Sequence, residues 1–238
     1  MELRRVVITG IGTINSLGHN VQEYFDNLVA GKSGAGWITR FDASLFKTRF
    51  ACEIKNYDPE KFGLDKRDAR RNDPFTQYAF IATDEAIKDS ALDLDVIDKN
   101  RAGVVVGSGI GGIETLVKEM KAFYEGGEVP RFSPFLVPMM IPDIASGMIS
   151  MKYGFRGPNY ATVSACSTSN HAMSDAFTLI RMGKADIIIT GGSEAPINVA
   201  SIGGFNASKA ISTNNEEYMT ASRPLDRTRD GFVMGEGA

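Results

Sequence analysis

The chain has 238 residues, 43% of them hydrophobic, so it is long enough to bury a substantial core as one large domain or half of a larger one. This composition excludes a disordered or fibrous protein. A net charge of −3 gives no basic field that would indicate nucleic-acid binding. Two cysteines favour a reducing compartment without disulfides, and no signal peptide or membrane-length apolar run is visible, so we expect the cytoplasm.

Hydrophobic periodicity predicts strands that alternate with helices from the first residues onward. We expect a buried strand over 5–11 that ends in glycines, and an amphipathic helix over 21–30. An irregular stretch over 37–65 follows and contains a short strand around Cys52. Alternation in that strand places Cys52 on the same face as apolar neighbours, so we interpret this cysteine as core packing.

The middle of the chain continues the alternation. Its predicted elements are, in order, a helix from Asp73 to about Leu92 opened by an Asp-Pro pair, a buried strand over 101–107, a helix over 113–124, a proline-rich connection over 126–142 and a helix over 144–153. Strands that alternate with helices predict an α/β fold with a mostly parallel sheet covered by helices.

Residues 159–172 place Cys166 where a strand pattern gives way to a helical one. Hydroxyl side chains over 167–169 are suited to cap the new helix, and a strand over 186–190 completes a βαβ unit. A helix start favours the thiolate of a nearby cysteine, which makes Cys166 a candidate nucleophile. The alternative is an inert cysteine that fills space.

Other motifs offer alternative chemistries. Gly107 to Gly112 fits G-x-G-x-x-G, which could place a dinucleotide at a helix start, but no second strand with an acidic end follows. A tight turn with close helix packing is the favoured interpretation. Residues 191–195 nearly match the hydrolase elbow G-x-S-x-G, without a helix closely after them. The isolated histidines and cysteines have no metal-ligand spacing, so we expect no metal or cofactor.

Neither histidine is placed to serve Cys166 as a base. His171 lies five residues further along, and a helix turns about 100° per residue, so the two side chains point to different faces. We expect His171 to pack or hydrogen-bond locally. His19 lies at a predicted helix entry and is interpreted as a surface or capping residue.

Seven motifs in order along the chain together resemble one family. They cover residues 5–12, 107–112, 133–138, 153–158, 164–168, 222–226 and 230–237. The chain resembles a β-ketoacyl-acyl carrier protein synthase over its whole length, and within that family it is most similar to the type II elongating synthase of bacterial fatty acid synthesis. The resemblance implies a thiolase-like fold with αβαβα layers. Residues 1–238 would form the N-terminal ketosynthase domain, with residues from about 200 on beginning a link to a C-terminal half.

The resemblance implies that Cys166 takes an acyl group from acyl carrier protein as a thioester, with its backbone N–H as one oxyanion donor. Malonyl-acyl carrier protein then loses carbon dioxide, and the carbanion attacks the acyl-cysteine. Ile110 and Phe205 match positions that line the acyl pocket. Phe135 matches one that reaches the partner subunit's pocket in a homodimer. Ordinary core packing is the alternative for these three side chains.

A basic cluster consists of Lys66, Arg67, Arg70 and Arg71. In the family this position docks the acidic acyl carrier protein, so the resemblance implies a partner-binding role. A solvated run of charges at a helix end is the alternative.

The other catalytic groups of the family are absent from the motifs of this chain. The resemblance places two histidines, a lysine and a glycine- and phenylalanine-rich loop beyond Ala238. We therefore expect a partial protein that is inactive alone, because catalytic groups act as a unit. A polyketide ketosynthase or a thiolase is an alternative within enzymes. A non-catalytic partner subunit is another, although such subunits lack the active cysteine.

Overall fold

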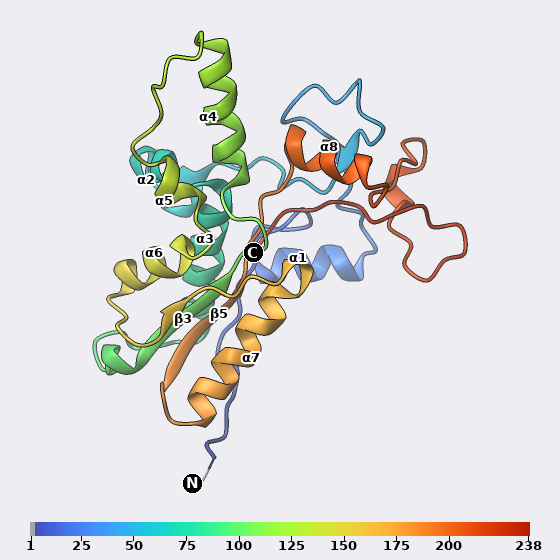
Figure 1. The fold of residues 1–238 in the computed structure, drawn as a ribbon. Helices are drawn as coiled ribbons and strands as arrows, with labels where there is room; N and C mark the ends of the chain where they lie inside the picture. The colour runs from blue at the N-terminus through green and yellow to red at the C-terminus, as the bar shows by residue number, and fades with distance from the viewer. Residues whose placement is uncertain (1–2) are drawn as a thin grey trace.

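The computed structural model describes residues 3–238, and a three-stranded parallel sheet lies in its lower half (Figure 1). Strand β3 (Ala102–Gly107) is buried along its whole length and lies between β4 (Asn159–Tyr160) and β5 (Ile187–Gly192). The α/β class with a parallel sheet is confirmed. The valine-rich sequence of β3 suits a strand covered on both faces.

Helix α7 (Thr168–Arg181) connects β4 to β5, which are not neighbours in the sheet. Val104 of β3 pairs with Asn159 on one side and Ile189 on the other. The predicted strand–helix–strand unit is therefore present, but its crossover passes over β3. Cys166 lies on the stretch between β4 and α7.

Helices cover both faces of this sheet. Helices α3 (Pro74–Asp89) and α6 (Ile144–Tyr153) share one core cluster with Val104 and its same-face neighbours on β3. Helix α7 contacts β3 and β5 and buries Ala172 and Ala176. Because successive strand residues point to opposite faces, β3 packs against helices on both sides.

Helix α3 starts as predicted and ends earlier. The Asp73 side chain accepts a hydrogen bond from the Phe75 N–H, with Pro74 in the first turn. The helix was expected to continue to Leu92, but Ala91 has a left-handed φ of 51°, which ends the helical geometry after Asp89. No residue in that last turn signals this conformation in the sequence.

Most of the remaining elements are short. They are α1 (Val21–Val29), β1 (Gly36–Trp37), β2 (Phe50–Ala51), η1 (Pro59–Phe62), α2 (Lys66–Arg71), η2 (Lys99–Arg101), α4 (Ile113–Glu125), α5 (Leu136–Met140), η3 (Ala165–Ser167), α8 (Val199–Ala207) and η4 (Tyr218–Thr220). Helix α5 lies inside the connection that was expected to be irregular. It has five residues, an internal proline and no side-chain cap, so the sequence pattern does not reveal it.

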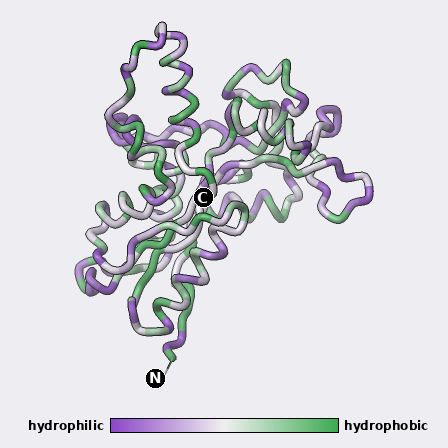
Figure 2. Tube along the Cα trace, viewed as in Figure 1, coloured by the Kyte–Doolittle hydropathy of each residue, from purple (hydrophilic) through white to green (hydrophobic). Residues whose placement is uncertain are grey.

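The strand predicted over 5–11 is wrong. The segment forms no strand, and the side chains of Val7, Ile8 and Ile11 are more than half exposed. Its β-branched sequence favours a strand, but the segment lies along α3. A Cβ on Gly10 would lie 2.2 Å from the Ala86 carbonyl oxygen, and the Ile11 N–H donates to the Asp89 carboxylate at 2.9 Å instead of to a strand. Figure 2 shows apolar residues in this N-terminal stretch.

A second region surrounds α8, beside the loops of residues 36–54 and 208–235 (Figure 1). Strands β1 and β2 pair antiparallel, and the backbone of Cys52 bridges to Gly235. Its buried apolar residues are Ile38, Ala43, Ala51, Ile197, Ile202, Ile211 and Met234. Cys52 is half-buried, and burial raises its pKa, in agreement with a packing role.

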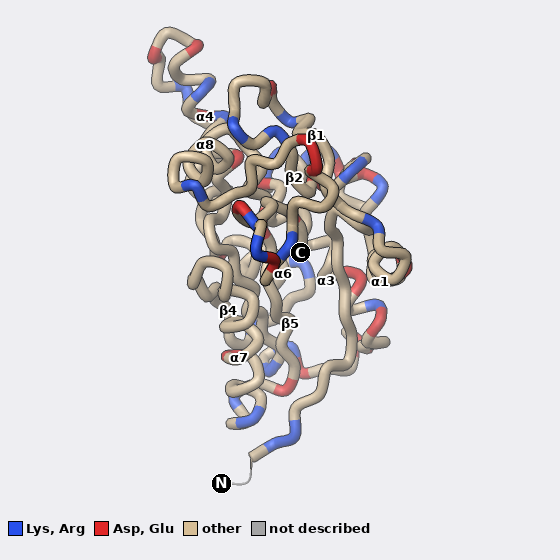
Figure 3. Tube along the Cα trace, turned by 90° about the vertical axis from the view of Figure 1, so that its right-hand side faces the viewer, with Lys and Arg blue, Asp and Glu red and all other residues tan. Residues whose placement is uncertain are grey.

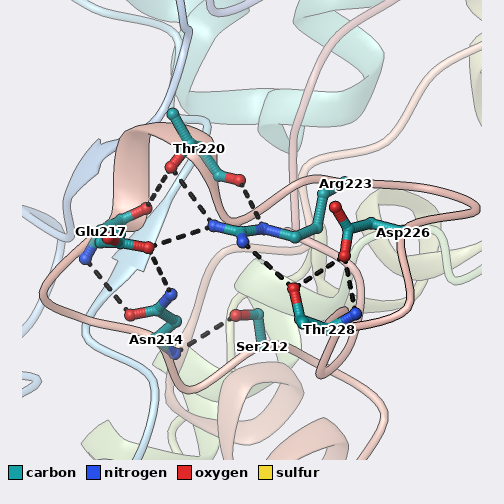
Figure 4. A network of polar contacts seen from close by, with 7 residues as sticks. All are labelled: Ser212, Asn214, Glu217, Thr220, Arg223, Asp226 and Thr228. Carbon is teal, nitrogen blue, oxygen red and sulfur yellow. Dashed lines mark hydrogen bonds and ion pairs between the residues drawn. The ribbon is translucent and has the colours of Figure 1, made fainter.

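Arg223 organises the loop of residues 212–228 (Figure 4). Its guanidinium donates to the Thr220 carbonyl at 3.1 Å and to the Glu217 carboxylate at 3.3 Å. The Asp226 carboxylate accepts from the N–H and hydroxyl of Thr228 at 2.6 and 2.7 Å. The motif at 222–226 therefore builds its own loop.

A buried ion pair joins the second region to α3. Arg40 contacts Glu236, whose side chain is 1% exposed, and donates to the Tyr78 hydroxyl at 3.1 Å. The Glu236 carboxylate also accepts from the Ile54 N–H at 2.7 Å. Burial raises the pKa of Glu236, while Arg40 beside it favours the ionised form. Removing one partner would leave the other charge buried without compensation, so the stability of this pair requires both side chains.

Among residues 3–238, no helix has both the length and the apolar character of a membrane span. In the same part of the chain, no group of three or more histidine, cysteine, aspartate or glutamate side chains is arranged to hold a metal ion.

Candidate active site

Cys166 lies in the 3-10 turn η3, between β4 and α7, and is exposed. The residue before it, Ala165, has a φ of 50°, a left-handed conformation that costs a non-glycine residue about 1–2 kcal/mol. The small alanine side chain limits steric conflict there. A sharp, strained turn therefore presents the sulfur to solvent at the start of a 14-residue helix.

Two hydroxyls hold this turn. The Ser164 N–H donates to the Thr168 hydroxyl oxygen at 2.9 Å, and the Thr162 hydroxyl donates to the Thr168 carbonyl at 2.9 Å. The prediction that a hydroxyl side chain caps this helix is wrong, because the N-cap residue Ser167 makes no side-chain hydrogen bond to the helix. The buried Thr168 hydroxyl instead braces the chain that enters the turn.

The backbone N–H of Cys166 donates to no acceptor among the described residues. It lies at the positive end of the α7 dipole, where donors that are not engaged attract negative charge. This N–H can stabilise an oxyanion that develops on an acyl group attached to the sulfur.

Each histidine has a hydrogen-bond partner other than the sulfur. Nδ1 of His171 lies 2.6 Å from the Ser164 hydroxyl, so the predicted local hydrogen bond is confirmed. Nε2 of His19 lies 2.8 Å from the Lys55 carbonyl. His19 borders a hollow of about 240 Å³ at the start of α1, and Cys166 does not line that hollow.

The glycine-rich turn after β3 lies against the Cys166 turn. Oε1 of Glu194 accepts hydrogen bonds from the backbone N–H groups of Gly109 and Ile110, at 2.5 and 3.1 Å, and from the Ser108 hydroxyl. A Cβ on Gly109 would lie 3.3 Å from the Ala165 carbonyl oxygen. The tight-turn interpretation is confirmed, because an internal carboxylate takes the N–H groups that a phosphate would need.

The three predicted acyl-pocket residues lie in different places. Ile110 is 40% exposed and follows Gly109 beside the Cys166 turn. Phe135 precedes α5, and its ring lies 5.0 Å from the Arg71 guanidinium. Phe205 on α8 packs in the second region with its ring 5.3 Å from that of Phe232. Of the three, only Ile110 is shown to lie near the Cys166 turn, through its neighbour Gly109.

The basic cluster forms the short helix α2 on the surface. The Asp65 side chain caps this helix, and all four basic side chains are exposed. Lys66 pairs weakly with Glu60 at 3.8 Å, and Arg70 Nε donates to the Lys66 carbonyl. Elsewhere on the molecule, basic and acidic residues are interspersed (Figure 3).

The family model described as "Beta-ketoacyl synthase, N-terminal domain" matches residues 3–238. The chain belongs to this family. The domain is 47% identical over 235 residues to 3-oxoacyl-[acyl-carrier-protein] synthase 2 of Staphylococcus aureus, with 99% of the chain and 56% of the relative covered. It is 42% identical to the protein of the same name from Synechocystis, with 100% and 57% covered. The ketosynthase domain therefore spans about half the length of these curated relatives.

Solved structures agree with the thiolase-like fold. The ishigamide ketosynthase/chain length factor superposes on the domain with a TM-score of 0.88 at 28% identity, covering 99% of this chain and 57% of that one. A β-ketoacyl synthase from Burkholderia phymatum gives 0.86 at 28% identity, with the same two coverages. AntDE, a type II polyketide ketosynthase solved with its acyl carrier protein AntF, gives 0.85 at 28%, covering 99% and 56%.

Sequence reasoning about this β-ketoacyl synthase domain missed Glu194 and the bracing role of Thr168. One signal for Glu194 was available. It follows β5 by two residues, and parallel strands end at the same edge of a sheet, so the end of β5 lies near the glycine-rich turn after β3. A carboxylate at that edge fits a turn rich in backbone N–H groups.

Proposed function

We propose that the full-length protein is an elongating 3-oxoacyl-[acyl-carrier-protein] synthase, an acyltransferase of fatty acid biosynthesis. The carrying observation is the exposed Cys166 on a strained turn at a helix start, with its N–H available to an oxyanion. The family match and the 47% identity to a 3-oxoacyl-[acyl-carrier-protein] synthase 2 support this proposal.

In the proposed reaction the Cys166 thiolate attacks the carbonyl of an acyl thioester on acyl carrier protein. The bond to the carrier's sulfur breaks, the carrier thiolate takes a proton, and an acyl-cysteine remains. Malonyl-acyl carrier protein then loses carbon dioxide. The resulting carbanion forms a carbon–carbon bond to the acyl carbonyl, and the Cys166 thiolate leaves.

We propose that the groups for decarboxylation come from the rest of the full-length protein, for which residues 1–238 form the N-terminal domain. His171 and His19 are held by Ser164 and the Lys55 carbonyl. A carbanion at malonyl needs stabilising donors in addition to the single N–H described at Cys166. The 238-residue chain alone is therefore expected to give no condensation.

The test compares the two cysteines in the full-length protein. Cys166→Ala is expected to abolish acyl-enzyme formation and condensation, while Cys52→Ala leaves both nearly unchanged, because Cys52 is half-buried with a raised pKa. Limiting iodoacetamide followed by mass spectrometry is expected to label Cys166 first. Preferential labelling of Cys52, or condensation by Cys166→Ala, would contradict the proposal.

We propose in addition that α2 docks the acidic acyl carrier protein. Lys66, Arg67, Arg70 and Arg71 are exposed on one short helix, and the Arg71 guanidinium lies over the Phe135 ring, which would link docking to the proposed acyl pocket. The solved AntDE:AntF complex shows that a ketosynthase of this fold binds its carrier. Exposed charges of this kind mainly set association rate and salt dependence.

The docking test reverses Lys66 and Arg70 to Glu in the full-length protein. We expect slower use of carrier-bound substrate with weaker salt dependence, and nearly unchanged use of a small pantetheine thioester. The matched control reverses Lys118 and Lys121, which are also exposed but lie on α4. An equal loss with both substrates would show that the cluster is structural.

We also propose the homodimer and cytoplasmic location that the family resemblance implies. A polyketide ketosynthase is the second candidate, since solved neighbours include such enzymes at 28% identity. The 47% identity to a fatty acid enzyme favours the first candidate. Product analysis with fatty acyl and polyketide carrier proteins distinguishes them, and exclusive use of a polyketide carrier would overturn the choice.

A further inference from the structure

Glu194 joins two structural elements at the edge of the sheet nearest Cys166. Its side chain is bonded to the turn after β3, through Ser108, Gly109 and Ile110. Its backbone is fixed separately, because the Glu194 N–H donates to the Gly237 carbonyl at 2.9 Å and the Gly237 N–H donates back at 3.0 Å. The carboxylate is therefore held from behind and directed at the turn.

The glycine-rich turn after β3 makes close contact with the residues that hold Cys166. Gly109 lies against the Ala165 carbonyl, and a Cβ on Gly107 would lie 2.3 Å from Cγ2 of Thr168. Ala165 and Thr168 flank Cys166 and fix its turn. The Cys166 turn is also held by the hydroxyls of Thr162 and Thr168, so a shift of the glycine-rich turn would chiefly change the place of Ile110 relative to it.

The carboxylate also determines the conformation of the turn. Three donors converge on one oxygen, and Ser108 uses its hydroxyl oxygen to accept from the Gly111 N–H at 3.0 Å. Gly111 has a left-handed φ of 73°, so few other contacts would impose this path on a flexible glycine segment. Without the carboxylate, two backbone N–H groups lose their partner and the place of Ile110 is no longer specified.

We propose that Glu194 is a positioning residue that sets acyl-chain selection. Its carboxylate fixes residues 108–111 and so holds Ile110 next to the Cys166 turn, where the Ile110 side chain would limit the length of acyl chain that the cysteine accepts. The inference rests on the proposed synthase function. Glu194 touches neither the sulfur nor the acyl group and acts through Ile110.

The test measures kcat and KM of the full-length protein with acyl thioesters from short to long. For Glu194→Ala, the ratio of long-chain to short-chain kcat/KM is expected to change by about tenfold, the scale on which apolar pockets discriminate. Alkylation of Cys166 by iodoacetamide is expected to stay close to that of the unchanged protein. Glu194→Gln keeps an amide oxygen as acceptor and is expected to restore most of the original profile.

The matched control is Glu216→Ala, which removes an exposed carboxylate that makes no hydrogen bond or ion pair among residues 3–238. If Glu194→Ala does not fold, Ser108→Ala removes one of the three donors and is expected to shift the profile in the same direction. An unchanged profile, or an equal loss at every chain length, overturns the inference. The proposed function still stands if Cys166→Ala abolishes acyl loading, and fails separately if the unchanged protein loads no acyl group.

Discussion

The sheet region and the α8 region of this domain hold their chains in different ways. Around β3, β4 and β5, the backbone is fixed by ladder bonds and by glycines that pack directly against neighbouring backbone. Around α8, strands are two residues long, and polar side chains hold loops to one another. The candidate nucleophile Cys166 lies in the first kind of structure, where close backbone packing and the hydroxyls of Thr162 and Thr168 hold its turn.

Asparagine and threonine side chains provide most of the links in the α8 region. The Thr48 hydroxyl donates to the Ser212 carbonyl at 2.6 Å, and the Asn206 side chain donates to that hydroxyl at 2.8 Å. Asn215 donates to the Lys47 carbonyl at 2.8 Å. Such links tolerate small movements of the loops, whereas the backbone contacts at Gly107 and Gly109 do not.

The largest effect is expected where the two regions meet. Arg40→Met leaves Glu236 buried without its counter-charge, so the free energy of unfolding should fall by about 3 kcal/mol or more. The double variant Arg40→Met/Glu236→Met should recover part of this loss. Chemical denaturation of the full-length protein measures both. Arg49→Met is the control at an exposed arginine, and an equal cost there would show that the buried pair has no special role.

A smaller effect separates backbone strain beside Cys166 from backbone strain elsewhere. Ala165→Gly should raise the free energy of unfolding by roughly 0.5 kcal/mol, because glycine adopts a φ of 50° without a Cβ conflict. Ala91→Gly, at a φ of 51°, is the matched control and should gain a similar amount. Only Ala165→Gly should lower kcat/KM, by a few-fold, since it loosens the Cys166 turn. Equal kinetics for both would argue against a positioning role for the strain.

The pH dependence of thermal stability distinguishes the exposed ion pairs of Asp186 from the buried pair of Arg40 and Glu236. Arg101 and Arg4 lower the pKa of Asp186 from 3.8 to about 2, and this stabilisation is present above the ordinary carboxyl pKa and lost as pH falls toward 2. Asp186→Asn should therefore lower the thermal midpoint slightly at pH 7 and make no difference near pH 2. Thermal melts over this range measure the gap between the two proteins. A gap that widens with acid would refute the assignment.

The smallest effect is expected in the loop of Figure 4. Arg223→Met removes exposed hydrogen bonds that contribute little to global stability, so the free energy of unfolding should change by about 0.5 kcal/mol or less. Amide exchange should nevertheless become faster over residues 213–228, because the loop loses its central donor. Arg227→Met, at an exposed neighbour, is the control. Unchanged exchange in both variants would show that Arg223 does not order the loop.

Most regular elements of the sheet region could be predicted from the sequence. Helices α1, α4 and α6 and strand β3 lie within one residue of the expected bounds, because their apolar spacing and end residues are local signals. The segment over 5–11 was mispredicted, because its apolar residues favour a strand whereas its backbone lies along α3 and donates to a carboxylate there. Local pattern does not report which neighbour a segment packs against.

For the candidate site, the sequence by itself determined that Cys166 follows a strand and begins a helix, since both patterns are local and the cysteine falls between them. It also predicted the local hydrogen bond of His171, because helical spacing turns the His171 side chain away from Cys166. Only the tertiary structure decided that Glu194 occupies the glycine-rich turn and that this turn contacts Ala165. These contacts join residues that are dozens of positions apart, and their geometry follows from how β3 and β5 pair rather than from any local propensity.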